Sequence, residues 1–308
     1  MSSAGPTSPL EAHGDHGAPP VSSSASPADD TFTWYRHPWN AAFTAAAPAT
    51  APTTVSVAQR EAFLRDGYFV IDDLIDPGIL SAVTAELDAL EAGVDQFLGT
   101  QNGGRFHIAE QGAITFSPHA VLRSSAARAL TRHRALVGLG RDLLGPDVNL
   151  YWDQAVYKKT EKPRRFPWHQ DNGYTYVEPQ LYLTCWLALT DATMDNGCPW
   201  VVPGAHRHGT LRHHWVDPIG WECFDDPPGA VLAEVRAGGA VIFSSVTPHL
   251  TGPNTTGAVR KAYIVQYAVD GAEILQGDPD AGPPVARLRQ DDPDRQYPVL
   301  RQGDPVAP

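Results

Sequence analysis

Two metal-binding residue types stand one residue apart in this chain, as His169 and Asp171 of the segment His-Gln-Asp. Successive side chains of a strand alternate between its faces, so on a strand these two would point the same way, toward one ion. A distant histidine, His249, would complete a set of two histidines and one carboxylate. Such a set leaves three adjacent coordination positions open and suits non-haem Fe(II) oxygen chemistry. We therefore expect a metal site built from His169, Asp171 and His249.

An arginine lies eleven residues after His249, across a Gly-Pro-Asn turn at 252–254. The guanidinium of this Arg260 can hold a carboxylate through two parallel hydrogen bonds. A dicarboxylate co-substrate needs such an anchor at its far end. Together, the metal set and the arginine predict an Fe(II)/2-oxoglutarate-dependent dioxygenase, with O2 as the other substrate.

Composition is compatible with one globular enzyme domain. The chain has 308 residues, of which 42% are hydrophobic, enough for a jelly-roll domain of about 250 residues. A formal net charge of -12 argues against nucleic acid, because phosphate binding needs clustered cations. The 8 Trp, 10 Tyr and 10 Phe can line a pocket for a small organic molecule. We expect a small-molecule substrate and no nucleic-acid partner, whereas the oligomeric state cannot be read from the sequence.

The three cysteines, Cys185, Cys198 and Cys223, show no CxxC spacing. An odd number without that spacing predicts neither a disulfide framework nor a zinc site, and it fits a reducing cytosol. No apolar run reaches membrane-spanning length, and no basic segment followed by an apolar one begins the chain. We therefore expect a cytoplasmic protein without a membrane partner.

The first 54 residues differ in composition from the rest of the chain. Residues 1–54 are rich in Ser, Pro and Ala and predict a disordered tail and linker, interrupted by an aromatic arm at 31–40 that docks on the domain. Residues 55–308 are expected to form a single domain. Ser56 and Gln59 form a capping box for a helix ending at Gly67, followed by a strand at 68–71.

Two further helices and a series of strands follow. Asp76 and Pro77 begin a helix that Gly93 closes, and another helix covers 135–144. Segments rich in β-branched and aromatic residues then predict strands at 148–158, 181–189, 231–235, 240–244 and 258–269. Helices first and many short strands afterwards predict a mainly β (α+β) fold, a double-stranded β-helix of jelly-roll or cupin-like type with N-terminal buttressing helices.

Several segments resemble one known family. The segment WHQDNGY at 168–174 resembles the metal motif of the phytanoyl-CoA dioxygenase family, and NGCPWVVPGAH at 196–206 is similar to its downstream signature. The FLRDG at 63–67 is similar to the family's N-terminal region. The likeness extends from about Val55 to Gln276, and it implies a double-stranded β-helix that binds Fe(II) and 2-oxoglutarate.

The resemblance also implies individual roles. Fe(II) would be bound by His169, Asp171 and His249, while Arg260 would hold 2-oxoglutarate with help from the Thr251 hydroxyl. Further co-substrate contacts are expected from the strand residues Gln154 and Trp186. Trp186 could equally be a core residue, and we interpret Lys158 as a solvated strand end.

Asp171 narrows the range of reactions that the predicted metal site could catalyse. Halogenases related to this family carry a small residue at that position, so that a halide can bind the iron. A carboxylate here favours an oxygenase, most simply hydroxylation of an unactivated C–H bond with release of succinate and CO2. Desaturation, epoxidation and ring closure share the same ligand set and stay open.

The substrate is less well indicated. Pocket walls are expected from 101–116, from residues beside the metal motif and from the aromatic insert 207–226, which could instead pack a small core of its own. The candidate substrate contacts are Trp152, Trp168, Tyr174, Tyr176, His214 and Trp221. No segment resembles a coenzyme A phosphate site, which favours a small, partly apolar metabolite. The Ala/Pro/Gly/Arg-rich composition resembles that of a high-GC actinobacterial protein, which favours a role in natural-product tailoring.

Two other classes of protein remain as alternatives. A jelly-roll could keep a metal without turnover, since fold alone does not fix function. A cupin-type metalloenzyme could act without 2-oxoglutarate. The presence of all four residues of the metal set and its arginine argues against both.

Overall fold

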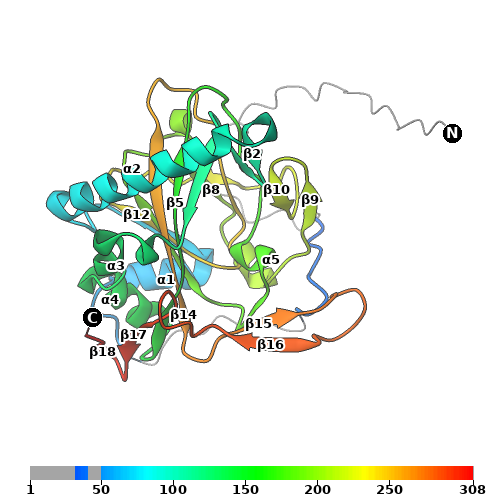
Figure 1. Ribbon diagram of the computed structural model, residues 1–308. Helices are drawn as coiled ribbons and strands as arrows, with labels where there is room; N and C mark the ends of the chain where they lie inside the picture. The colour runs from blue at the N-terminus through cyan, green and yellow to red at the C-terminus, as the bar shows by residue number, and fades with distance from the viewer. Residues whose placement is uncertain (1–31, 41–49, 308) are drawn as a thin grey trace.

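The computed structural model describes residues 32–40 and 50–307. Two antiparallel sheets form its centre, a large one in the order β1-β12-β7-β14-β5-β4-β3-β2 and a small one in the order β11-β8-β13. They face each other across an apolar cluster to which Trp186, Val241 and Phe243 of the large sheet contribute. This arrangement is the double-stranded β-helix that the sequence predicts (Figure 1).

The strand bounds are as follows. The large sheet contains β1 (Tyr68–Ile71), β2 (Arg105–Phe106), β3 (Ala109–Glu110), β4 (Ile114–Pro118), β5 (Val148–Lys158), β7 (Leu183–Ala188), β12 (Ala240–Ser244) and β14 (Arg260–Val269), with β17 (Pro298–Arg301) and β18 (Asp304–Pro305) attached through β5. The small sheet contains β8 (Pro199–Val201), β11 (Val231–Leu232) and β13 (His249–Thr251). A third sheet contains β6 (Val177–Glu178), β15 (Glu273–Gln276) and β16 (Ala286–Arg289), and a hairpin contains β9 (His214–Val216) and β10 (Gly220–Glu222).

Helices cover the face of the large sheet that points away from the small one (Figure 1). They are α1 (Val57–Asp66), α2 (Pro77–Gly99), α3 (Ser125–Leu130) and α4 (Arg134–Leu143). A one-turn helix, α5 (Asp171–Tyr174), and the short 3-10 helices η1 (Asn102–Gly104), η2 (Ala120–Leu122), η3 (Met194–Asn196) and η4 (Ala205–His208) lie in the connections. The largest apolar cluster fills the space between the helices and the sheet, so the opposite face of the sheet remains for the small sheet and a cavity.

The predicted start of order is confirmed, but the predicted end of the second helix is wrong. Ser56 and Gln59 form the capping box of α1, and Gly67 ends it with a φ of 84°. Asp76 makes no side-chain cap bond, and α2 continues through Gly93 to Gly99. Gly93 adopts no left-handed conformation and has open space beside it, so nothing there interrupts the helix.

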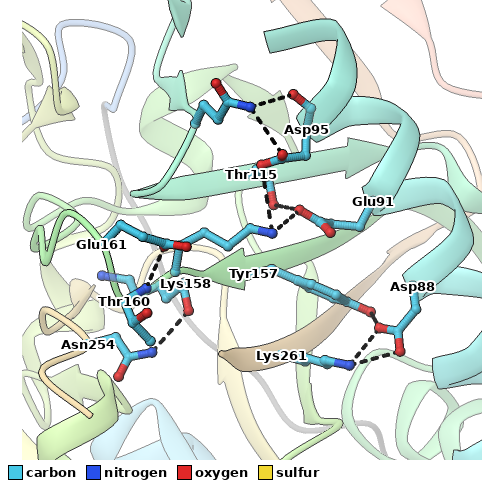
Figure 2. Close-up of polar contacts among 12 residues, drawn as sticks. Asp88, Glu91, Asp95, Thr115, Tyr157, Lys158, Thr160, Glu161, Asn254 and Lys261 are labelled. Carbon is cyan, nitrogen blue, oxygen red and sulfur yellow. Dashed lines mark hydrogen bonds and ion pairs between the residues drawn. The ribbon is translucent and has the colours of Figure 1, made fainter. Parts of the chain in front are cut away.

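The turns of α2 beyond Leu87 are fixed to the sheet by a row of acidic residues, Asp88, Glu91 and Asp95 (Figure 2). The partners of this row are Tyr157 and Lys261 on Asp88, Thr115 and Lys159 on Glu91, and Gln111 on Asp95. These contacts hold the final turns of α2 over the neighbouring strands β4 and β5. The charged pairs therefore explain why the helix extends past the predicted stop.

The predicted strands agree with the structure, apart from their ends. β5 and β12 have the predicted bounds, while β7, β14 and β11 are shorter. The helix predicted at 135–144 is α4, displaced by one residue, and α3 was not predicted.

The remaining sequence expectations concern the arm, the cysteines and the membrane. Residues 32–40 lie against the domain, with Arg36 paired to Leu211 and the Trp34 ring stacked 4.6 Å from that of His208. Of the tail and linker predicted within 1–54, residues 1–31 and 41–49 lie outside the described residues. All three cysteines are free and buried. Within the described ranges, no helix is long and apolar enough to cross a membrane.

Candidate metal centre and adjoining cavity

The predicted metal ligands lie together although 80 residues separate the two histidines in the sequence. His169 and His249 form an isolated antiparallel bridge, with reciprocal N–H···O distances of 2.9 and 2.8 Å. The Oδ1 atom of Asp171 lies 3.9 Å from Nε2 of His169 and 3.8 Å from Nε2 of His249. All candidate ligand atoms fall within 4.8 Å of one another, so a single ion can contact all three.

The local backbone differs from the predicted strand. Gln170 is extended, but Asp171 is the first residue of α5 and not part of a strand. One extended residue suffices to bring the side chains on either side of it to the same face. The strand prediction was therefore wrong after Gln170, although the expected convergence of His169 and Asp171 occurs.

Gln170, between the two ligands, is buried and held on all sides. Its side-chain amide donates to the carbonyls of Gly209 and Val246 at 2.9 and 2.6 Å and accepts from Leu211 N–H at 2.6 Å. Its own N–H donates to Nε2 of His213 at 2.9 Å, and burial lowers the pKa of that histidine to about 4. A neutral His213 is the form that can accept this bond. The metal motif is thus fixed by segments distant in sequence.

The hydrogen bonds around the ligands set their protonation. Nδ1 of His169 lies 2.9 Å from the Pro167 carbonyl and Nδ1 of His249 lies 3.0 Å from the Thr247 carbonyl. Each Nδ1 must donate its proton there, which leaves Nε2 free to bind a metal. Burial, with His249 beside it, lowers the pKa of His169 and favours the neutral ring.

The third ligand, Asp171, is oriented by a chain of two hydrogen bonds. Its Oδ2 accepts from the Thr184 hydroxyl at 2.5 Å. The hydroxyl oxygen of Thr184 in turn accepts from the Gln266 side-chain amide at 3.2 Å. Two neutral imidazoles and one such carboxylate are the donor set that fits Fe(II) with open positions. The residues present therefore fit the expected ion.

Arg260, the first residue of β14, is fully buried with incomplete hydrogen bonding. Its Nη1 donates to the Val156 carbonyl at 3.3 Å, while Nε and Nη2 have no partner. The guanidinium carbon lies 5.0 Å from the centre of the Trp186 ring, and burial lowers the pKa of the group. An unpaired buried charge is strongly unfavourable. A carboxylate beside it would supply both the missing charge and the missing acceptors.

The predicted co-substrate residues meet around one cavity of about 800 Å³. Its lining includes the metal ligands, Arg260, Thr251, Gln154 and Trp186. Trp186, which could equally have been a core residue, does both: it belongs to the inner apolar cluster and lines the cavity.

Lys158 is not the solvated strand end that we expected from the sequence. It is fully buried opposite Arg260 and donates to the backbone carbonyls of Arg164 and Thr251 at 2.9 Å each, and to that of Gly252. Burial, followed by the repulsion of Arg260, lowers its pKa. Lys158 therefore ties the segment leading to His169 to the segment following His249.

The predicted substrate contacts divide into two groups. Trp152 and Tyr174 line the cavity. Trp168, Tyr176, His214 and Trp221 are not among its lining residues. Trp168 packs in a separate cluster with Trp200, Tyr176 lies against His37 of the arm, and the other two belong to the exposed β9–β10 hairpin. The aromatic insert 207–226 therefore supports the metal motif from outside the cavity, through backbone atoms and through His213.

A β-bulge adds a residue to the cavity wall. Gln266 pairs with Trp152, but the next residue, Tyr267, pairs with Leu150, so Tyr151 is an extra residue on β5. A bulge lets two consecutive side chains face the same side. Both Tyr151 and Trp152 line the cavity.

Other lining residues were missed from the sequence. They are Val94, Phe97 and Leu98 of α2, and Arg123, Gln290, Arg295 and Gln296 from two distant loops. Continuing the helical spacing of Leu87 and Leu90 past Gly93 would have indicated the first three. The loop residues follow no period that predicts a contact.

The chain is similar to several known proteins. A phytanoyl-CoA dioxygenase of Arabidopsis thaliana is 33% identical over 101 residues, which cover 31% of this chain and only 35% of that protein. The ectoine dioxygenase of Nocardia farcinica is 28% identical over 219 residues, covering 64% of this chain and 72% of that protein. The crystal structure of the epimerase SnoN in complex with Fe3+, alpha ketoglutarate and nogalamycin RO shares the fold, with a TM-score of 0.61 and 22% identity over 78% of this chain and 97% of that one.

A family model settles the relationship. The model of phytanoyl-CoA dioxygenase (PhyH) matches residues 63–262, a range that contains the metal set and Arg260. Because this match covers more than half of the chain, the protein belongs to the phytanoyl-CoA dioxygenase family.

Proposed function

We propose that the chain is an Fe(II)- and 2-oxoglutarate-dependent dioxygenase that oxidises a C–H bond of a small molecule and releases succinate and CO2. The observation that carries this proposal is the joint lining of one cavity by the ligand set and by the unpaired guanidinium of Arg260. We take residues 55–308 to act as one catalytic domain.

The proposed roles follow from the contacts. His169, Asp171 and His249 hold the iron, and Thr184 and Gln266 orient the carboxylate. Bound iron supplies the activation of dioxygen that oxidative decarboxylation of 2-oxoglutarate requires.

The co-substrate is held at its other end by this chain. Arg260 and the Thr251 hydroxyl bind its far carboxylate, with Trp186 packed beneath the guanidinium and Gln154 beside it on the cavity wall. A cupin-type metalloenzyme without 2-oxoglutarate would leave Nε and Nη2 of Arg260 without acceptors, so this alternative is less favoured.

Asp171 supports oxygenation over halogenation. Its carboxylate occupies the position that a halide would need, and its hydrogen bond from Thr184 fixes it there. The mainly apolar lining would disfavour water beside the reacting groups once a substrate fills the cavity. We therefore propose hydroxylation of an unactivated C–H bond as the reaction. Relatives named ectoine dioxygenase, and a fold relative bound to nogalamycin RO, support a small-molecule substrate of secondary metabolism.

The test is succinate formation from 2-oxoglutarate with Fe(II), O2 and a panel of metabolites. Asp171→Ala and His249→Ala should abolish turnover and weaken anaerobic Fe(II) binding, because each removes a ligand. His214→Ala, an exposed histidine outside the cavity, is the matched control and should keep both properties. Full activity in Asp171→Ala, or oxidation of a metabolite that does not need 2-oxoglutarate, would contradict the proposal.

A further inference from the structure

The cavity has a charge opposite to that of the chain as a whole. The net charge of the protein is -12, yet its cavity is lined by three arginines, Arg123, Arg260 and Arg295. Among the described lining residues, the sole carboxylate is that of the metal ligand Asp171. A bound Fe(II) would add two positive charges, and 2-oxoglutarate would remove two. A cavity with low-dielectric walls and charges of one sign concentrates ligands of the other sign.

Two of these arginines lie apart from the co-substrate anchor. Arg260 pairs with Lys158 at one end of β5. Arg123 donates to the carbonyl of Pro118 at 3.1 Å, and Pro118 pairs with Gln154, four residues back along β5.

Arg295 belongs to the loop before β17, and its side chain lies beside β5, further from Arg260 than Arg123 does. Its Nη1 is 3.2 Å from Nε2 of His119. The centre of the His119 ring lies 4.2 Å from that of Trp152, which is six residues before Lys158 on β5. Because the Arg260 guanidinium donates to the Val156 carbonyl, Arg123 and Arg295 flank β5 two to four residues from it, roughly 7–13 Å at about 3.3 Å per residue. A dicarboxylate that spans the distance from Arg260 to the metal ligands is not available to bind this second pair, so the pair is left for another ligand.

Both of these arginines keep donors available. Within the described part of the chain, Arg123 has no carboxylate partner within ion-pair distance, and its recorded bond is to a backbone oxygen. Arg295 pairs with Asp292 through Nε at 2.8 Å, which leaves Nη2 free. Asp292 itself is not a lining residue, so its charge neutralises Arg295 from outside the cavity.

Another part of the cavity lining is apolar. Its members are Val94, Phe97 and Leu98 of α2, with Phe106, Ile108, Phe116 and Phe166. Phe97 and Phe106 are 46% and 51% exposed with ring centres 5.6 Å apart, so large apolar surfaces lie open to solvent at this wall. The volume of about 800 Å³ is in the upper part of the range for pockets that enclose drug-sized ligands. It exceeds what the co-substrate alone needs.

We propose that, given the proposed function, the substrate is a bulky, mostly apolar organic acid. Its acid group lies between Arg123 and Arg295, and its apolar body lies along the wall formed by α2 and the β2–β3 hairpin. This site disfavours amine substrates, because no carboxylate other than the metal ligand lines the described cavity. It needs no coenzyme A carrier, since the anion is recognised directly.

A pair of fluorescent probes tests this recognition without any turnover. Anilinonaphthalene sulfonate and its uncharged parent, phenylnaphthylamine, have the same apolar body and differ by one acid group. Equilibrium titrations of the full chain, with and without Fe(II) and 2-oxoglutarate under anaerobic conditions, give both affinities. We expect the sulfonate to bind roughly tenfold or more tightly, as one or two charge-assisted hydrogen bonds provide.

Three variants locate the probes and the charge recognition. In the double variant Arg123→Gln/Arg295→Gln, the preference for the sulfonate should fall to about twofold or less, with phenylnaphthylamine affinity unchanged. Arg287→Gln, an exposed arginine outside the cavity, is the matched control and should keep the preference. Ala109→Trp, which places a large side chain on β3 at the cavity wall, should weaken the binding of both probes.

Three results would overturn the inference. These are equal affinity of the two probes for the wild-type chain, an unchanged preference in the double variant, and unchanged binding of both probes in Ala109→Trp. The proposed function fails separately, through absence of 2-oxoglutarate-dependent succinate formation. A sulfonate preference lost in the double variant would then still show an organic-anion site.

Discussion

At the scale of single residues, Arg260 distinguishes a 2-oxoglutarate enzyme from other uses of the same metal set. We predict that Arg260→Ala leaves Fe(II) binding nearly intact but raises the 2-oxoglutarate concentration for half-maximal turnover about a hundredfold or more. Removing one partner of a buried charge pair costs on the order of 3–5 kcal/mol, at about 1.4 kcal/mol per tenfold. Arg260→Lys should recover part of this, because an ammonium cannot form two parallel bonds. Succinate formation at saturating iron measures both.

Arg287→Ala serves as the control for loss of an arginine, since Arg287 is exposed on β16. If Arg260→Ala kept the wild-type 2-oxoglutarate dependence, the carboxylate anchor would have to lie elsewhere. Lys158, buried opposite Arg260, would be the next candidate. Its three carbonyl partners already use the donors of its ammonium, which is why we place Arg260 first.

At the scale of elements, the N-terminal arm supports the metal motif through one intervening segment, residues 208–213. Asn40 donates to the carbonyls of His208 and Thr210 at 2.8 and 2.9 Å, and the Thr210 hydroxyl accepts from Asn172 at 2.7 Å. The segment 208–213 therefore lies between the arm and the residues around Asp171.

We predict that deleting residues 1–40 weakens Fe(II) binding about tenfold, because outer partners of metal ligands commonly contribute that much. Deleting only residues 1–31 leaves Asn40 and its contacts in place and should have no such effect. Anaerobic Fe(II) titration of both forms makes the comparison. Equal affinities of the two truncated proteins would show that the arm does not support the site.

The elements also show what the sequence could predict. Strong periodic or capping signals located α1, β5 and β12, and residue chemistry alone identified His169, Asp171, His249 and Arg260. The end of α2 was missed because side-chain pairs with β4 and β5, which no local pattern contains, extend the helix past Gly93.

The cavity was harder to predict for a related reason. Arg123 and Arg295 come from loops 172 residues apart, and only the folded sheet brings them to one wall. Aromatic content misled the expectation for 207–226, since His214 and Trp221 lie on an exposed hairpin. A high aromatic content indicates that a segment packs against another part of the protein. It does not indicate which face of the segment makes that contact.

At the scale of the whole molecule, Asp153 links stability to pH. It is fully buried between the large sheet and the helices, accepting from Val121 N–H and the Tyr263 hydroxyl through Oδ2, while Oδ1 has no partner. Burial raises its pKa from 3.8 to about 6. The fold thus favours the protonated acid, and this contribution is complete below pH 3.8 and is lost as the pH rises through 6.

We predict that Asp153→Asn becomes more stable relative to wild type as the pH rises from 4.5 to 7.5, by about 2 kcal/mol at about 1.36 kcal/mol per pKa unit. Urea unfolding of the metal-free proteins at both pH values gives the difference. Asp304→Asn, an exposed acid, should show no comparable trend. A stability difference that is constant with pH would mean that Asp153 stays ionised in the folded protein.

The three buried cysteines have a consequence for following this protein in solution. Cys185 lies in β7, Cys198 precedes β8, and Cys223 donates from Sγ to the carbonyl of Trp168, the residue before His169. Burial raises the pKa of all three thiols, so an alkylating reagent must wait for each region to open. The order of labelling would record which part of the barrel opens first. Iron binding at His169 should selectively slow the labelling of Cys223, which would make that thiol a chemical reporter of metal occupancy.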